Sequence, residues 1–110
     1  MKIVRNSIIP FKGYKLINLF GVLFCREGTE LNDVDINHES IHTAQMKEML
    51  FLFFYIHYAI EFLLKMFMYP SFHKTYRAIS FEREAYAYEE DLDYLSRRKH
   101  YKWLQFIINN

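Results

Sequence analysis

The distribution of apolar residues predicts strands in the first quarter of the chain. Residues 2–11 and 14–26 are rich in Ile, Val, Leu and Phe, and Lys12-Gly13 between them is a turn signal. The pattern therefore predicts a β-hairpin over residues 2–26. Gly21 interrupts the second run and indicates a bulge or a close approach of the backbone. The second run is apolar on both faces, as in a strand packed on helices, and an exposed edge there could bind an extended peptide.

The region after the predicted hairpin has a helical pattern. No Gly or Pro occurs between residues 29 and 69, and Asp and Asn residues at 33–37 favour a capped helix that begins at about residue 36. The following stretch, residues 50–69, is nearly long enough and apolar enough to span a bilayer. However, His57, Glu61 and Lys65 recur at intervals of four and would form one polar stripe. We therefore expect a buried or interfacial amphipathic helix, with peripheral membrane contact through residues 50–69 left open.

A further helix is predicted after the break at Pro70. Apolar residues recur with helical spacing from Lys74 to Leu95, acidic residues occupy the intervening positions, and a basic run follows. We expect a helix over residues 74–97. Together these elements predict one α+β domain over residues 1–110, in which the N-terminal β-hairpin packs on a bundle of three to four helices.

Composition and charge narrow the classes of function. The chain has 110 residues, a formal net charge of +1 and 19% aromatic residues, so nothing in its charge favours nucleic acid as a partner. The single cysteine, Cys25, has no partner within the chain for a disulfide. The first residues do not lead into an apolar segment of the signal-peptide type. We therefore expect a cytoplasmic protein.

The residues with the clearest chemistry are His38, Glu39 and His42, which form a His-Glu-x-x-His motif in His38-Glu39-Ser40-Ile41-His42. On a helix, imidazoles at positions i and i+4 lie on one face, so both can bind one Zn²⁺ at about 2.0–2.1 Å. The glutamate beside the first histidine can then act on a metal-bound water. The motif therefore predicts a zinc site with Glu39 as its general base.

A second motif follows in Phe81-Glu82-Arg83-Glu84-Ala85-Tyr86, and the combination resembles the small gluzincin-type metallopeptidase domains. In these domains a downstream helical glutamate is the third zinc ligand, often within a Glu-x-x-Ala pattern that Glu82 to Ala85 matches. Gln45 extends the first motif to a form seen in some members. The resemblance covers roughly residues 16–95. At Tyr86 many relatives have an acidic residue that orients a ligand.

The resemblance implies a zincin-like fold and a hydrolase that cleaves a peptide or protein substrate. It implies His38, His42 and Glu82 as the metal ligands and Zn²⁺ as the cofactor, with Glu39 activating the water. This ligand set places a condition on the fold. If residues 36–68 formed one straight helix, Glu82 would lie ~30 Å from the histidines at 1.5 Å per residue, and His100 would become the third-ligand candidate. We therefore predict a break near residues 49–53, although no Gly or Pro occurs there.

Two other functions are compatible with the same residues. The chain could be a non-catalytic interaction or membrane-associated module without metal, with the apolar helix 50–69 as its contact surface and with a homo-oligomer as one form of it. It could also be a di-iron carboxylate protein, because Glu39-x-x-His42 fits half of that pattern, but no second Glu-x-x-His occurs in the sequence.

Overall fold

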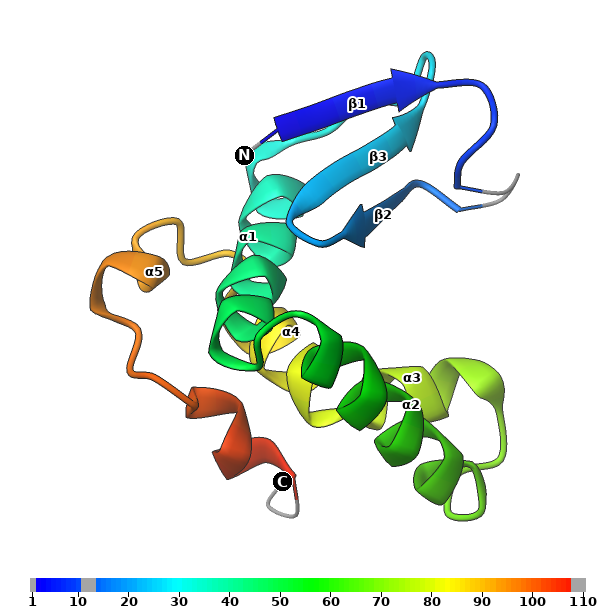
Figure 1. Cartoon of the computed structure of the whole chain (residues 1–110), viewed down its shortest axis with the longest axis vertical. Helices are drawn as coiled ribbons and strands as arrows, with labels where there is room; N and C mark the ends of the chain where they lie inside the picture. Colours follow the sequence, from blue (N-terminus) through cyan, green and yellow to red (C-terminus); the bar gives the residue numbers. More distant parts are fainter. Residues whose placement is uncertain (1, 11–13, 108–110) are drawn as a thin grey trace.

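The computed structural model describes residues 2–10 and 14–107 and has an α+β fold. A three-stranded sheet of order β1-β3-β2 is formed by β1 (Lys2–Asn6), β2 (Leu16–Leu19) and β3 (Val22–Arg26). Strand β1 pairs with β3 in parallel, and β2 pairs with β3 antiparallel. Figure 1 shows this sheet at one end of the molecule, beside the first helix, with the remaining helices at the other end.

The predicted pairing of the two apolar runs as a hairpin is wrong, because β1 pairs with β3 in parallel. The hairpin lies within the second apolar run, where Leu19 faces Val22 across a two-residue turn, Phe20-Gly21. Both turn residues have positive φ, at 54° and 88°, which is the conformation that a two-residue hairpin favours and that glycine adopts readily. Gly21 is therefore a turn residue rather than a bulge, and its backbone does approach a neighbour closely, since an added Cβ would lie 3.4 Å from the Thr43 side chain. The expected turn at Lys12-Gly13 lies outside the described residues.

Five α-helices and one 3₁₀-helix follow the sheet within the described part of the chain. They are α1 (Asp33–Glu48), α2 (Leu52–Met66), α3 (Phe72–Ala78), α4 (Ser80–Tyr88), α5 (Tyr94–Arg97) and the 3₁₀-helix η1 (Lys102–Phe106). Helix α1 begins three residues earlier than predicted because Asn32 and Asp35 form a reciprocal capping box. The His-Glu-x-x-His motif therefore begins in the second turn of α1 and ends in the third.

The break between α1 and α2 occurs where we predicted it. The two helices are separated by three residues and bent by 108°. The Leu50 and Phe51 N–H groups donate to the carbonyls of Lys47 and Met46, in the pattern that commonly ends helices at a glycine. Here the left-handed position is occupied by Leu50, with φ of 52°, and Phe51 also has positive φ. Because no glycine favours this conformation, packing of the aromatic side chains around it must stabilise the break.

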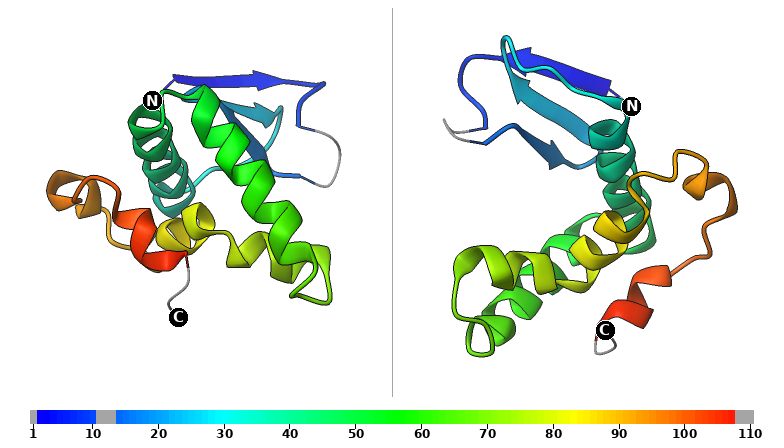
Figure 2. Two further views of the ribbon diagram at one scale, coloured as in Figure 1. Left: turned by 60° about the horizontal axis from the view of Figure 1, so that its bottom comes forward. Right: turned by 180° about the vertical axis from the view of Figure 1, so that it is seen from behind.

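That packing comes from the main apolar cluster. Met46, Phe54, Ile79, Phe81 and Trp103 are buried together, with Phe51 and neighbouring aromatic residues packed against them. The Phe54 and Phe81 rings stack at 4.5 Å between centroids and join α2 to α4. Figure 2 shows α2 leaving the break at an angle to α1 and approaching α3, with which it packs. The cluster therefore holds the bent α1–α2 pair against α4.

The single helix predicted over residues 74–97 is wrong, because the chain forms α3, α4 and α5 instead. Ile79 has an extended ψ of 135° and separates α3 from α4. The Glu61 carboxylate on α2 accepts hydrogen bonds from the Ser80 N–H at 2.6 Å and the Ser80 hydroxyl at 2.7 Å, so it caps the start of α4. At the other end, the Asn37 amide donates to three carbonyls, those of Tyr88, Glu89 and Asp91.

The expected polar stripe on α2 is confirmed and faces the protein interior. His57 Nε2 lies 3.0 Å from Glu61 Oε2, and Lys65 donates to Glu61 Oε1 at 2.8 Å. Glu61 and Lys65 are both buried. In the described part of the chain no single helix is long and apolar enough to cross a membrane, although α1 and α2 taken together have the necessary length and composition.

The left-handed residue at the break gives a stability prediction. Leu50 is 71% exposed, so its replacement removes little packing. We expect Leu50→Gly to raise the free energy of unfolding by up to about 1 kcal/mol, because glycine adopts positive φ without strain. The matched change Leu63→Gly, at an exposed position inside α2, should lower it by about 1 kcal/mol. Urea denaturation measures both, and an equal loss in the two variants would contradict the role of Leu50.

Candidate metal centre

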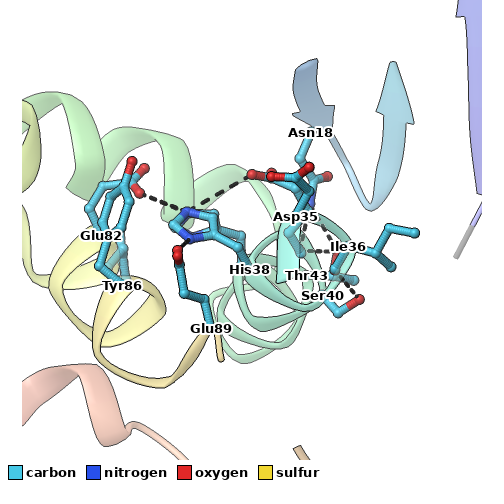
Figure 3. A network of polar contacts seen from close by, with 12 residues as sticks. Asn18, Asp35, Ile36, His38, Ser40, Thr43, Glu82, Tyr86 and Glu89 are labelled. Atoms are coloured by element: carbon cyan, nitrogen blue, oxygen red, sulfur yellow. Dashed lines mark hydrogen bonds and ion pairs between the residues drawn. The ribbon is translucent and has the colours of Figure 1, made fainter. Parts of the chain in front are cut away.

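Three side chains from two helices converge on one point. Helix α1 presents His38 and His42 on one face, one turn apart, and α4 presents Glu82 opposite them. Glu82 Oε1 lies 3.2 Å from His38 Nε2 and 3.0 Å from His42 Nε2, and the two nitrogens are 3.1 Å apart. Figure 3 shows His38 between Glu82 and Glu89. All three converging residues are buried.

The spacing of these atoms fits a small tetrahedral ion. An ion with bonds of about 2.0–2.1 Å separates its ligand atoms by roughly 3.3–3.4 Å, and the three observed separations are 3.0–3.2 Å. A small opening of the triangle would accommodate the ion. Two histidines and one glutamate are also a donor set that zinc enzymes use while a fourth position stays open. The residues present therefore fit Zn²⁺.

Hydrogen bonds on the far side of each ring determine which nitrogen faces the centre. His38 Nδ1 lies 2.8 Å from the Glu89 carboxylate. An ionised carboxylate accepts hydrogen bonds and has no hydrogen to donate. His42 Nδ1 lies 2.8 Å from Gln45 Oε1, and the Gln45 amide nitrogen donates to Phe81 O and Glu84 Oε1. Both Nδ1 atoms therefore carry hydrogen, so the Nε2 atoms, which both face Glu82 Oε1, are the ring nitrogens that a metal would bind in place of a proton. This is how histidine ligands are commonly oriented in metal sites.

The charges at the centre favour a cation. Burial lowers the pKa of His42, but the charges of Glu82 and Glu39 and the hydrogen bonds to Glu82 and Gln45 together outweigh burial and raise the pKa to about 10. For Glu82 itself, burial raises the pKa, but the charges and hydrogen bonds of the two imidazoles together lower it by more. The net shift of the Glu82 pKa is strongly downward. Glu82 therefore stays ionised in the interior. Its second oxygen, Oε2, accepts a hydrogen bond from the Tyr58 hydroxyl at 2.9 Å, which directs Oε1 toward the histidines.

Glu39 lies beside this group but farther from it. Its Oε2 is 4.0 Å from His38 Nε2, and one donor atom each from Glu39, His38 and His42 fall within 4.8 Å of one another. Glu82 has the better position for a ligand because one of its oxygens is within 3.2 Å of both imidazoles. Burial raises the pKa of Glu39, and the two imidazoles reduce this shift without reversing it. A carboxylate with a raised pKa at this distance is suited to exchange a proton with a bound water.

A cleft of about 320 Å³ opens onto the site. Residues from the start of β2, from α1 and from α3 and α4 line it, including Leu16, His38, Glu39, Tyr76 and Tyr86. The Tyr76 and Tyr86 hydroxyls are 3.3 Å apart, and burial raises the pKa of each. They are therefore neutral hydrogen-bond donors at one wall of the cleft. Strand β2 is at the edge of the sheet, and its first residue, Leu16, lines the cleft.

The four site residues suggested by the sequence, His38, Glu39, His42 and Glu82, all lie together. His100 does not join them, because its side chain is 89% exposed and its Nδ1 contacts Glu48 at 3.2 Å. The ~30 Å separation that a straight helix would have imposed is therefore not found.

Two supporting residues were missed in the sequence. Glu89 orients His38, whereas the resemblance to gluzincin-type domains had directed attention to the position of Tyr86 for such an acidic residue. A signal for it existed, since Glu89 follows Glu82 by seven residues, or about two helical turns. Tyr58 had no comparable signal, because its position depends on how α2 packs against α4.

Comparisons with known proteins do not identify a family. No family model, curated protein or solved structure matches this chain.

A buried ion cluster lies behind His42 and connects the site to the C-terminal part of the chain. The Arg98 guanidinium donates to Glu48 in a bidentate arrangement at 2.9 Å and to Glu84 at 2.5 and 3.0 Å. Glu84 is fully buried, and Tyr94 also donates to it at 2.6 Å. Because Glu84 accepts from Gln45 as well, this cluster fixes the amide that orients His42.

The cluster gives a stability prediction for Arg98, and the preceding residue, Arg97, provides the control. Arg98→Ala would leave two buried carboxylates without their cation, so we expect it to lower the free energy of unfolding by about 3–5 kcal/mol. Arg97→Ala removes only an exposed ion pair with Asp91 and should cost less than about 1 kcal/mol. Chemical denaturation followed by circular dichroism measures both. Similar losses in the two variants would show that the cluster does not stabilise the fold.

Proposed function

We propose that this protein is a zinc-dependent peptidase with a gluzincin-like site. The observation that carries the proposal is the convergence of His38 Nε2, His42 Nε2 and Glu82 Oε1 within 3.2 Å of one another, at the spacing of ligands around a tetrahedral ion. The proposed ligands are these three residues, and the proposed fold type is zincin-like. The cleft leading to them supports access by a substrate.

The chemistry follows from the position of each group. Bound Zn²⁺ would acidify a water molecule and polarise a carbonyl oxygen. Glu39 takes the proton from the attacking water and passes it to the leaving amine, which its raised pKa favours. Tyr76 and Tyr86 donate hydrogen bonds toward the negative charge that develops on the carbonyl oxygen. An extended peptide in the same cleft would pair with the edge strand β2 at Leu16, because the Asn18 carbonyl farther along the strand already accepts a hydrogen bond from Tyr55.

Metal content and hydrolysis test the two halves of this proposal separately. We expect one equivalent of Zn²⁺ per chain in protein purified without an affinity tag, and none in the variant with both His38→Ala and His42→Ala. Glu39→Gln should retain the metal and lower hydrolysis of a quenched fluorescent peptide library by at least about 100-fold. Glu90→Gln, at an exposed position, is the control for hydrolysis. Elemental analysis by mass spectrometry gives the metal content.

The outcomes separate this proposal from its alternatives. Equal metal content in the wild type and the double-histidine variant would refute the metal site and favour an interaction module. Metal binding without hydrolysis of any peptide in the library would refute the peptidase assignment and leave the metal site intact. Iron in place of zinc would favour the carboxylate-protein alternative.

Glu89 provides a finer test of the ligand geometry. Its carboxylate holds the Nδ1 hydrogen of His38, so Glu89→Ala should weaken Zn²⁺ affinity by about 10–100-fold. Glu90→Ala, at the next position and exposed, should leave the affinity unchanged. Competition with a chelating dye measures both affinities. If Glu89→Ala binds as tightly as Glu90→Ala, His38 is not oriented through Glu89.

A further inference from the structure

Helix α2 has the reverse of the usual polarity for a helix in contact with water. Its charged residues, Glu61 and Lys65, are buried against α3 and α4, as described above. Within Leu52–Phe67, all of which the structure describes, every exposed side chain is apolar. These exposed residues form the α2 apolar face: Leu52, Phe53, Ile56, Ala59, Ile60, Leu63, Leu64, Met66 and Phe67. At 100° per residue they cover an arc of roughly 160° along the whole helix.

The apolar surface continues around the end of α2. Phe67 is 92% exposed, and Met68 on the connection and Phe72 at the start of α3 are also largely exposed. An apolar hollow of about 190 Å³ lies beside this connection, between Phe62, Met66 and Phe72. Figure 1 shows the α2–α3 connection at an extremity of the molecule, far from the sheet. The exposed apolar residues on the helix face and at its projecting end are therefore contiguous. A contiguous patch of this kind marks an interaction surface, whereas single scattered apolar residues do not.

The charged side chains that directly follow the α2 apolar face in the chain have one sign. The sequence has no Asp or Glu between residues 62 and 81. Within the same stretch Lys74 and Arg77 on α3 are exposed. A contact between two copies of this face would bring these cations together without a carboxylate from the same stretch to pair with them. A negatively charged surface would complement them.

We propose that the α2 apolar face and the α2–α3 connection dock on an anionic lipid surface. The helix has 15 residues, so its length is about 22 Å at 1.5 Å per residue, which is shorter than the roughly 30 Å of a bilayer core. It therefore lies in the interface, with Phe67 and its neighbours among the acyl chains and Lys74 at the headgroups. The inward-facing Glu61 and Lys65 stay paired within the protein. This docking does not depend on the proposed peptidase activity.

Vesicle flotation of the full chain tests the docking. We expect binding to vesicles of phosphatidylcholine with phosphatidylserine, and binding at least tenfold weaker to phosphatidylcholine alone. The triple variant Ile60→Gln, Leu64→Gln and Phe67→Gln should lose at least about tenfold in binding to the anionic vesicles. The matched triple variant Ile8→Gln, Leu92→Gln and Leu104→Gln changes apolar side chains of similar exposure elsewhere and should bind as the wild type does. Circular dichroism and Zn²⁺ content should be unchanged in both variants.

Charge reversal tests the anionic part of the proposal. Lys74→Glu should lower binding to the anionic vesicles by roughly tenfold, whereas Lys2→Glu, at an exposed position on β1 at the far end of the molecule, should not. Equal binding to neutral and anionic vesicles would overturn the assignment to an anionic surface. No vesicle binding, with a dimer in sedimentation velocity that the Ile60, Leu64 and Phe67 changes convert to monomer, would assign the face to a second copy instead. Loss of metal binding would leave these outcomes unaffected.

Discussion

The arrangement of the site depends on how α4 is held at its two ends. The Glu61 carboxylate from α2 accepts the hydrogen bonds of Ser80 at the first residue of α4, and the Asn37 amide from α1 donates to the carbonyls at its last turn. Glu82 lies between these two contacts. Because each contact satisfies backbone groups that a short helix leaves unpaired, α4 is fixed along its axis as well as in its packing. The position of Glu82 opposite the histidines follows from this.

The three helices are coupled through the same few residues. Asn37 is adjacent to His38 in α1, so the side chain that caps the end of α4 and the side chain that meets Glu82 come from one turn of helix. On α2, Tyr58 contacts Glu82 directly and Glu61 caps α4 one turn away. A displacement of α2 would therefore change the orientation of Glu82. The exposed face of α2 is on the opposite side of the same helix. A molecule that binds this face therefore contacts the helix that carries Tyr58 and Glu61.

The polar groups around the histidines form two separate supports. His38 is oriented by Glu89, which is 23% exposed in its side chain, whereas His42 is oriented by Gln45, which donates to the fully buried Glu84 that pairs with Arg98. The second support draws on the C-terminal part of the chain, beyond α5. Residues more than fifty positions from the motif thus contribute to its geometry, and they do so through ionic hydrogen bonds that are costly to break in the interior.

The sequence by itself determined the features that depend on local spacing. The interval of four between His38 and His42 puts both on one face of any helix, and the asparagine and aspartate residues before them provide its cap. The polar stripe of His57, Glu61 and Lys65 follows from the same periodicity. The α+β composition could also be read from the alternation of apolar runs and helical periodicity.

Only the tertiary structure decided the features that depend on contacts between distant residues. The two-residue turn at Phe20-Gly21 divides the second apolar run into β2 and β3, which pair with each other. The first run therefore pairs in parallel with the free edge of β3 instead of forming the expected hairpin. The bend at Leu50 and Phe51 needs aromatic packing to stabilise positive φ without glycine, and the division between α3 and α4 needs Glu61 as a cap. No local pattern encodes these, since each depends on a side chain or a surface that becomes adjacent only on folding.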